Sequence, residues 1–309
     1  MMNIDINDLK LLNMIADMPE LPSVGAFNIR KNSGLADRRS TENIEIISKT
    51  DKSGIDIRIK PFTKNEKVHI PVIITDSGIS ELVYNDFYVG EGAEVEIVAG
   101  CGIHNSGCDS SRHDGVHRFF IGKNASVKYV EKHYGSGEGS GERIMNPETV
   151  LYLEEGAVCE LETVQIEGVD STVRKTDATL ERNARLIVTE RLMTHGKQTA
   201  RTDMEIKLNG EGASARIISR SVAKDSSEQI FYPRAVGNAP CRAHVQCDSI
   251  IMDEAKIRSI PEIAANHADA QIVHEAAIGR INNDQLLKLM TLGISSEKAE
   301  EIIVQGFLK

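Results

Sequence analysis

The sequence contains no tryptophan, and the aromatic residues make up only 4% of its 309 positions. A folded core must therefore come from valine, isoleucine, leucine and alanine, which suit narrow, regularly stacked layers. Clusters of lysine and arginine are also missing, and the formal net charge is −10. Because binding to nucleic-acid phosphates requires clustered cationic side chains, we expect no nucleic-acid partner.

Long apolar runs are absent as well. No run approaches the roughly 18 residues that a membrane-spanning helix needs, and residues 1–8 lack the basic and apolar parts of a signal peptide. We therefore expect a cytoplasmic protein with no membrane partner. An odd number of cysteines in such a protein indicates free thiols rather than a disulfide framework. Five are present: Cys101, Cys108, Cys159, Cys241 and Cys247.

A repeated unit runs through the middle of the chain. Each copy has two apolar residues, a few polar residues ending mostly in Gly or Asn, an alanine, and then alternating apolar positions. A Gly or Asn can adopt a positive φ where a strand turns a corner, and the alanine methyl then fits a tight inward bend. The even spacing favours a mainly β fold, a β-solenoid, over a β-sandwich built from hairpins. The alanines that mark the unit are Ala93, Ala125, Ala157, Ala184, Ala213 and Ala255.

Both ends of the chain change to a helical period. Residues 7–16 carry apolar side chains on one helical face. Near the other end, Asn283 or Asp284 can cap one helix, and Ser295 or Ser296 can cap a second. Such a hairpin either covers the end of the core or receives a partner. The expected division is an N-terminal helical segment over residues 1–40, a β-solenoid core over 41–278 and a C-terminal helical segment over 279–309.

A first group of metal-ligating and nucleophilic residues lies within 17 positions, and comprises Cys101, His104, Cys108, His113 and His117. Thiolates and imidazoles can ligate zinc or iron, but the spacing of the two cysteines matches no tight tetrahedral knuckle. A nucleophilic thiol activated by neighbouring histidines is at least as well supported. Chance clustering in a polar loop is the remaining interpretation.

A second group is spread over the C-terminal part of the chain and comprises Cys241, Cys247, His267, His274 and Glu275. These residues form no contiguous motif. One or two turns of a solenoid can nevertheless bring positions 247 and 274 next to each other.

The glycine-rich segment 135–141 superficially resembles a phosphate-binding loop. It lacks the Gly-Lys-Ser/Thr ending and the strand-to-helix setting of such loops, so we expect a flexible loop. A function that uses ATP would therefore need another subunit to bind it.

Several separated elements of the C-terminal third closely resemble the SufB/SufD family, the scaffold subunits of the SUF iron–sulfur assembly complex, and the likeness extends from about residue 95 to 309. The resemblance implies a right-handed parallel β-helix flanked by helices. It also implies a C-terminal helical region that binds SufC, an ABC-type ATPase. The elements that carry it are Gln246–Ile250, Val273–Ala276, Gly279–Ile281, Asp284–Leu286, Gly293–Ser295 and Gly306–Phe307.

Individual roles carry over from the same resemblance. Cys247 resembles the cluster-building cysteine of SufB, and Glu275, with His274 beside it, resembles its acidic partner. Gly100-Cys101 with His113 downstream resembles the place where SufB accepts sulfur. A site that mixes thiolate with imidazole and carboxylate suits a cluster that must later be released. The predicted cluster-binding residues are Cys247, His274 and Glu275, and the predicted sulfur acceptors are Cys101 and Cys108, supported by His104, His113 and His117.

The resulting hypothesis is a scaffold rather than an enzyme, carrying a transient iron–sulfur cluster and working with a SufC-like ABC ATPase and a sulfur donor protein. The short chain with a SufB-type cysteine suggests that one polypeptide replaces the SufB–SufD pair as a homodimer, with ligands shared between copies. A SufB/SufD-type heterodimer and a role for flavin stay open. The alternatives are a zinc-dependent hydrolase that uses His104, His113 and His117, and a purely structural solenoid.

Overall fold

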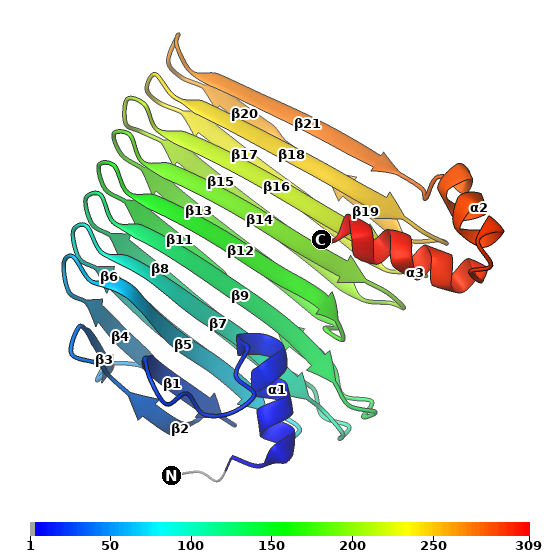
Figure 1. Cartoon of the computed structure of the whole chain (residues 1–309), viewed down its shortest axis with the longest axis horizontal. Helices are drawn as coiled ribbons and strands as arrows, with labels where there is room; N and C mark the ends of the chain where they lie inside the picture. Colours follow the sequence, from blue (N-terminus) through cyan, green and yellow to red (C-terminus); the bar gives the residue numbers. More distant parts are fainter. Residues whose placement is uncertain (1–3) are drawn as a thin grey trace.

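The computed structural model describes residues 4–309, which form two long β-sheets with one helix near the N-terminus and two at the C-terminus (Figure 1). None of the described helices has the length and apolar character needed to cross a membrane.

The first sheet runs in the order β2 (Gly34–Arg39), β1 (Ala26–Lys31), β5 (Lys64–Ile74), β7 (Glu94–His104), β9 (Ser126–Ser136), β12 (Val158–Glu167), β14 (Arg185–Thr194), β16 (Ser214–Ala223), β18 (Arg242–Ile251) and β21 (Gln271–Gly279). The second sheet runs in the order β3 (Ile44–Ser48), β4 (Gly54–Ile59), β6 (Ser80–Val89), β8 (Ser111–Ile121), β10 (Arg143–Met145), β13 (Ser171–Leu180), β15 (Thr199–Leu208), β17 (Glu228–Gly237) and β19 (Lys256–Ser259). Two further strands share rows with β10 and β19, namely β11 (Glu148–Leu153) and β20 (Glu262–Ala265).

Strands one coil apart pair in parallel, and the chain alternates between the two sheets. Strand β14, for example, pairs with β12 on one side and with β16 on the other. Only a crossover through the opposite sheet connects such neighbours, whereas the hairpins of a sandwich give antiparallel pairs. The predicted β-solenoid is therefore confirmed, and the sandwich alternative is wrong. Antiparallel pairs occur at the N-terminal end, where β1 pairs with β2 and β3 with β4.

The repeated alanines mark the corners of the coils. Ala125 and Ala157 are fully buried, and the amide of each donates to the carbonyl three residues earlier, at 3.1 Å and 3.0 Å. The residues just before them, Asn124 and Gly156, have φ of 55° and 70°. These left-handed conformations favour Asn and Gly, which explains the sequence pattern. Apolar residues after each corner point into the lumen and form one continuous core along the solenoid.

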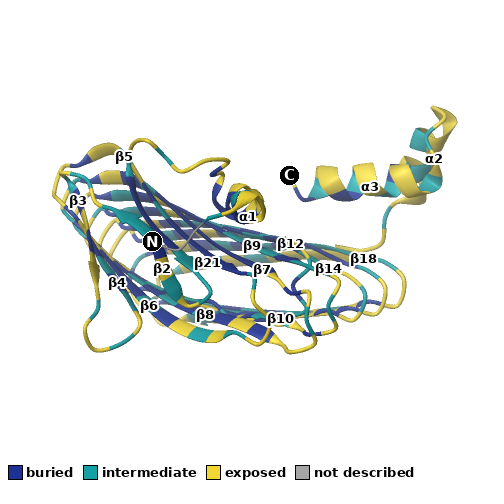
Figure 2. Ribbon diagram, turned by 90° about the horizontal axis from the view of Figure 1, so that it is seen from below, coloured by how far each residue is buried: buried dark blue, intermediate teal, exposed yellow. Residues whose placement is uncertain are grey.

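Helix α1 (Ile6–Ala16) confirms the helix predicted over residues 7–16 and lies on the outer face of the first sheet (Figure 2). The Asp5 carboxylate caps it by accepting from the amides of Asn7 and Asp8. The helix approaches β7 so closely that a Cβ on Gly100 would lie 2.4 Å from the Ile15 carbonyl oxygen. The first two strands of the solenoid, β1 and β2, follow directly and lie within the segment 1–40.

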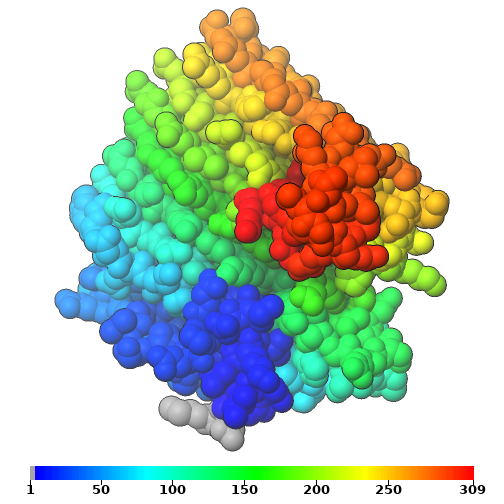
Figure 3. All heavy atoms as spheres, turned by 45° about the vertical axis from the view of Figure 1, so that its right-hand side comes forward, coloured from blue at the N-terminus to red at the C-terminus, as the bar shows by residue number. Residues whose placement is uncertain are grey.

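Helices α2 (Asn283–Thr291) and α3 (Ser296–Phe307) form the predicted hairpin, which is raised on the surface of the solenoid (Figure 3). Ser295 caps α3 as predicted, whereas the cap of α2 is Asn282, one residue before the expected position. Val304 and Leu308 of the α3 end pack against Val222 of the solenoid. No residue of α2 is buried, so only α3 anchors the hairpin.

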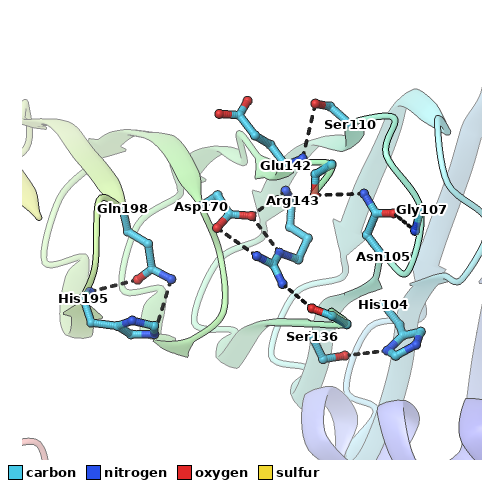
Figure 4. A network of polar contacts seen from close by, with 12 residues as sticks. His104, Asn105, Gly107, Ser110, Ser136, Glu142, Arg143, Asp170, His195 and Gln198 are labelled. Carbon is cyan, nitrogen blue, oxygen red and sulfur yellow. Dashed lines mark hydrogen bonds and ion pairs between the residues drawn. The ribbon is translucent and has the colours of Figure 1, made fainter. Parts of the chain in front are cut away.

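The glycine-rich segment is held in register and is not a free loop. The amides of Gly139 and Gly141 donate to the carbonyls of Asn105 and Gly107, each at 3.1 Å. A Cβ on Gly139 would lie 2.2 Å from the Gly107 oxygen, so the small residues permit this stacking. Figure 4 shows the polar contacts that tie the neighbouring loops, including the bidentate pair of Arg143 with Asp170. The segment therefore forms the next coil above the loop that carries Cys108.

Replacing Gly139 by alanine is expected to lower the free energy of unfolding by about 1–3 kcal/mol, the usual cost of overpacking. The same change is expected to raise the rate at which Cys108 reacts with a thiol reagent, because the methyl group pushes the two loops apart. Denaturant unfolding and thiol-labelling kinetics measure the two effects. Ser140→Ala, at the next and exposed position, serves as the control. Equal stability and labelling for both variants would contradict the stacking argument.

Candidate functional site

Two of the predicted cluster-binding residues meet inside the C-terminal end of the solenoid. Cys247 of β18 is only 3% exposed, and its Sγ lies 3.2 Å from Nε2 of His274 on β21. The two strands pair in parallel with Val245 opposite His274, so both side chains point into the lumen. The prediction that one or two solenoid turns bring positions 247 and 274 together is confirmed, and a single turn separates them.

Glu275 lies on the other side of the same strand. Neighbouring residues of a strand point to opposite faces, and the Glu275 side chain is 65% exposed on the outer face, where its carboxylate lies 3.4 Å from Nε2 of His244. Within one copy of the chain the structure therefore separates Glu275 from the pair of Cys247 and His274.

The remaining members of the second group lie elsewhere. Cys241 is buried in the core at the start of β18, and His267 faces Asp269 at the surface. Neither residue contacts the Cys247 thiol.

The pair of Cys247 and His274 carries little charge before metal binds. Burial raises the pKa of the Cys247 thiol to about 11, against the effect of the Ser259 side chain, which lowers it. Burial also lowers the pKa of His274. A thiol and a neutral imidazole thus face each other, and a metal ion would displace the thiol proton. Because β21 is the last strand of its sheet, the pair lies next to the C-terminal end of the solenoid (Figure 1).

The first group of predicted residues is divided between the lumen and the surface. Cys101 of β7 points inward and is 2% exposed, and His113 and His117 of β8 point inward from the opposite sheet. All three line one small cavity. His104 lies at the end of β7 on the outer side, where Nδ1 is 3.0 Å from the Ser136 hydroxyl (Figure 4), and Cys108 is exposed in the following loop. His104 therefore cannot join His113 and His117 around one zinc ion, and the geometry gives no support to the hydrolase alternative.

Residues that the sequence reasoning missed complete a buried polar network around this cavity. The Asn85 amide lies 3.3 Å from Nε2 of His117, whose Nδ1 lies 2.5 Å from the Tyr129 hydroxyl. The hydroxyl donates to Glu131, and Arg174 forms a buried ion pair with the same carboxylate. The donor and acceptor roles in this series of hydrogen bonds assign His117 a proton on Nδ1 and a lone pair on Nε2. The sequence signal that could have identified Glu131 is the period-2 alternation of β9, which places position 131 in the lumen.

The charges of this network are set by burial and by the ion pairs. Burial alone would raise the pKa of Glu81, but the hydrogen bond from His113 and the charge of Arg30 lower it to about 2. Although burial opposes it, Arg174 holds the pKa of Glu131 well below its usual range. Burial lowers the pKa of His117 to about 4, against the attraction of Glu131. Two carboxylates and a neutral imidazole are therefore the stable forms at neutral pH.

The low pKa of His117 predicts a loss of stability in acid. In the unfolded chain the imidazole takes up a proton near 6.5, whereas in the folded protein it does so near 4. The stability that the fold gains from a neutral His117 is fully present above pH 6.5. It decreases by about 2–3 kcal/mol as the pH falls towards 4. His117→Gln is expected to reduce the difference in unfolding free energy between about pH 7 and about pH 4.5 by that amount. Urea unfolding measures it, and His104→Gln, at a surface position, is the control that should leave the difference unchanged.

Polar side chains also occupy the lumen between the two cysteines. Glu190 of β14 accepts hydrogen bonds from the hydroxyls of Thr202 at 2.8 Å and Ser219 at 2.7 Å, and all three residues are buried. Ser219 stands opposite Cys247 in the register of β16 and β18. Within residues 4–309, no group of three or more His, Cys, Asp or Glu side chains is arranged to hold a metal ion. One copy of the chain therefore offers two ligands at the Cys247 site.

Comparison with known proteins adds a family to this geometry. The model of the SufBD core domain, described as SUF system FeS cluster assembly, matches residues 77–307, which include both cysteine sites. An iron–sulfur cluster assembly SufBD family protein of Methanocaldococcus jannaschii is 27% identical over 285 residues, covering 91% of this chain and 89% of the relative. A protein of the same description from Archaeoglobus fulgidus is 29% identical over 264 residues, covering 84% of this chain and 69% of the relative.

Proposed function

Because the chain belongs to the SufBD family of the SUF system for iron–sulfur cluster assembly, we propose that it is a scaffold on which a transient cluster is built and then passed on. The observation that carries the proposal is the 3.2 Å approach of the Cys247 thiol to His274. Thiolate is the preferred protein ligand of iron–sulfur clusters, and an imidazole in place of a second thiolate gives a less firmly held cluster. A site with these two ligand types therefore suits a cluster that must later be released.

Two ligands per copy are too few for a cluster, so we propose that a second copy contributes the rest. Strand β21 is the last strand of its sheet, and such edges are ready to pair with another chain. A two-fold axis beside β21 would bring two sets of Cys247 and His274 to one junction. The exposed carboxylate of Glu275 is then available to the partner copy rather than to its own. A SufB/SufD-type heterodimer would use the same edge.

Sulfur is proposed to enter at the other cysteine site. Cys108 is exposed and accessible to a sulfur donor protein, while Cys101 lies beside the buried histidines. Buried polar side chains, including Glu131, Glu190 and Ser219, lie in the lumen between the positions of Cys101 and Cys247. His113 and His117 support Cys101, whereas His104 on the outer face is placed to act only near Cys108.

The helical hairpin is proposed to receive the SufC-like ABC ATPase. Leu287 and Met290 of α2, and Leu292 just beyond it, are each more than 40% exposed, and α2 buries no residue. A raised apolar helix attached to the solenoid through α3 alone is suited to bind a partner and to transmit its movement.

Anaerobic reconstitution of the purified protein with ferrous iron and sulfide tests the proposed function. We expect cluster absorption bands, followed by their loss when an apo-ferredoxin is added and becomes loaded. A protein that binds no cluster, or that binds one and never transfers it, would refute the scaffold role.

A further inference from the structure

Arginines from separate coils come together on the outer face of the first sheet. On β14 and β16, every charged residue that points outward is an arginine. Ser214 of β16 stands in register between Arg185 of β14 and Arg242 of β18. In the sequence these arginines are a coil apart, so they form no basic run there. The residues of this arginine face are Arg185, Arg216, Arg220 and Arg242.

The side chains of the arginine face have no anionic partner. None of them makes a hydrogen bond or an ion pair with another residue among positions 4–309. Arg220 is half-buried and stands opposite Asp248, but that carboxylate accepts from the Gln246 amide at 2.7 Å. The carboxylate of Glu275 lies 3.4 Å from His244. Because a guanidinium stays charged at neutral pH, the face keeps its positive charge without a counter-charge from its own chain.

The helices leave this face open. Helices α1 and α3 stand on the same side of the first sheet and leave the first halves of β14, β16 and β18 uncovered between them (Figures 1 and 2). The α3 end packs against Met193 and Val222, at the far ends of β14 and β16. Arg185, Arg216 and Arg242 lie nearer the starts of their strands and are all exposed. A partner can therefore reach the arginines without displacing either helix.

The side chains around the arginines suit a protein partner. Ile187 and Ile218 lie among them and are half-buried, and Val273 of β21 is 50% exposed. Arginine beside apolar side chains is typical of protein interfaces, whereas a nucleic acid needs a continuous basic stripe. The chain as a whole carries a net charge of −10. An acidic protein is repelled by most of this surface and attracted to the arginine face, so its approach is oriented.

The arginine face lies beside the proposed cluster site. Arg242 belongs to β18, the strand whose Cys247 points into the lumen, and Arg216 stands opposite His244 of the same strand. Neighbouring strands lie about 5 Å apart, so β16 is roughly 10 Å from β21, which carries His274. A protein docked on the arginines would be next to the cluster. It would leave the edge of β21 free for a second copy and α2 free for the ATPase.

We propose that the arginine face is the docking surface for the protein that receives the cluster, and that this recipient is acidic and presents carboxylates to the four arginines. The inference rests on the scaffold role proposed above and adds the class of partner that takes the cluster. Each carboxylate would supply the counter-charge that an arginine of this face lacks within its own chain.

Arg216→Glu tests the inference, with Arg258→Glu as the matched control. Arg258 is exposed on β19, in the opposite sheet, and both variants change the net charge by the same amount. Binding of a fluorescently labelled, acidic apo-ferredoxin to the full-length, cluster-free protein is measured at low ionic strength. We expect Kd to rise about tenfold in Arg216→Glu, because a close attraction becomes a repulsion. In Arg258→Glu it should stay within about twofold of the wild type, since a distant charge is screened.

Added salt should weaken binding by the wild type and remove most of its advantage over Arg216→Glu. Cluster reconstitution of Arg216→Glu should match the wild type and shows that the variant is folded. Equal affinities in all three proteins, or equal losses in both variants, would overturn the docking face while the scaffold role stands. Tighter binding of a labelled DNA duplex than of the ferredoxin, lost in Arg216→Glu, would overturn the choice of a protein partner. Ferredoxin binding that depends on Arg216 without any cluster transfer would support the face and refute the scaffold role.

Discussion

A Cys247→Ala variant reconstituted anaerobically with iron and sulfide is expected to bind less than about a tenth of the cluster that the wild type binds. The physical reason is that Cys247 supplies the thiol that faces His274 between β18 and β21, at 3.2 Å. Loss of the sulfur leaves an imidazole as the sole ligand of that copy. Iron counting and the absorption spectrum measure the effect.

Cys159→Ala provides the matched control. Cys159 is fully buried in the solenoid core, and burial raises the pKa of its thiol to about 12, so it is a small packing residue. This variant should bind cluster as the wild type does. Full cluster binding by Cys247→Ala, or equal losses in both variants, would refute the assigned site.

The same reconstitution assay distinguishes the contribution of His274 to cluster binding from that of Glu275. In one isolated copy only His274 faces Cys247, so His274→Ala should weaken cluster binding while Glu275→Gln leaves it intact. If the copies share ligands across β21, Glu275→Gln weakens binding as well, and mixing it with Cys247→Ala restores part of the signal in mixed dimers. The ranking of the two variants therefore decides whether the site is shared.

Binding of the proposed SufC-like ABC ATPase is expected to weaken by a factor of roughly 30 or more in a Leu287→Glu variant, as for a residue at the centre of an interface. Leu287 is 57% exposed on α2, a helix with no buried residue. A carboxylate at this position would be desolvated without a partner in the complex. Calorimetric titration of the scaffold with the ATPase measures the change.

Leu35→Glu is the control for this experiment. Leu35 is 46% exposed on β2, at the opposite end of the solenoid, and receives the same substitution. The affinity of the Leu35→Glu variant for the ATPase should equal that of the wild type. Unchanged binding by Leu287→Glu would show that the partner docks elsewhere.

The sequence predicted the solenoid because the corners impose a strict local requirement. Each corner needs a small buried residue after a residue that tolerates positive φ, as at Asn124 and Ala125, and this requirement leaves a readable period. The meeting of Cys247 with His274 was predictable for the same reason, since one coil separates them.

It was harder to predict which residues of a strand point into the lumen and which point outward. Strand β21 lies at an edge and alternates poorly between apolar and polar residues, so its inward positions were not evident and Glu275 was grouped with His274. The network around Glu131 was missed because a solenoid lumen is expected to be apolar, and because its ion-pair partner Arg174 lies 43 positions away. The glycine-rich composition of residues 135–141 also led to the wrong expectation of a flexible loop, because contacts with the coil below determine the conformation.

The two ends of the solenoid differ, and the difference limits how far copies can associate. At the N-terminal end the short strands β2 and β3 fold back antiparallel on their neighbours, and β2 ends in Asp37, Arg38 and Arg39. At the other end β21 is longer and parallel to the strand before it. Two molecules that join through β21 present the folded-back strands β2 and β3 at both outer ends. If copies pair through β21 as proposed, growth through this edge terminates at the pair, and a fold with the repetitive geometry of a fibre is kept from forming one.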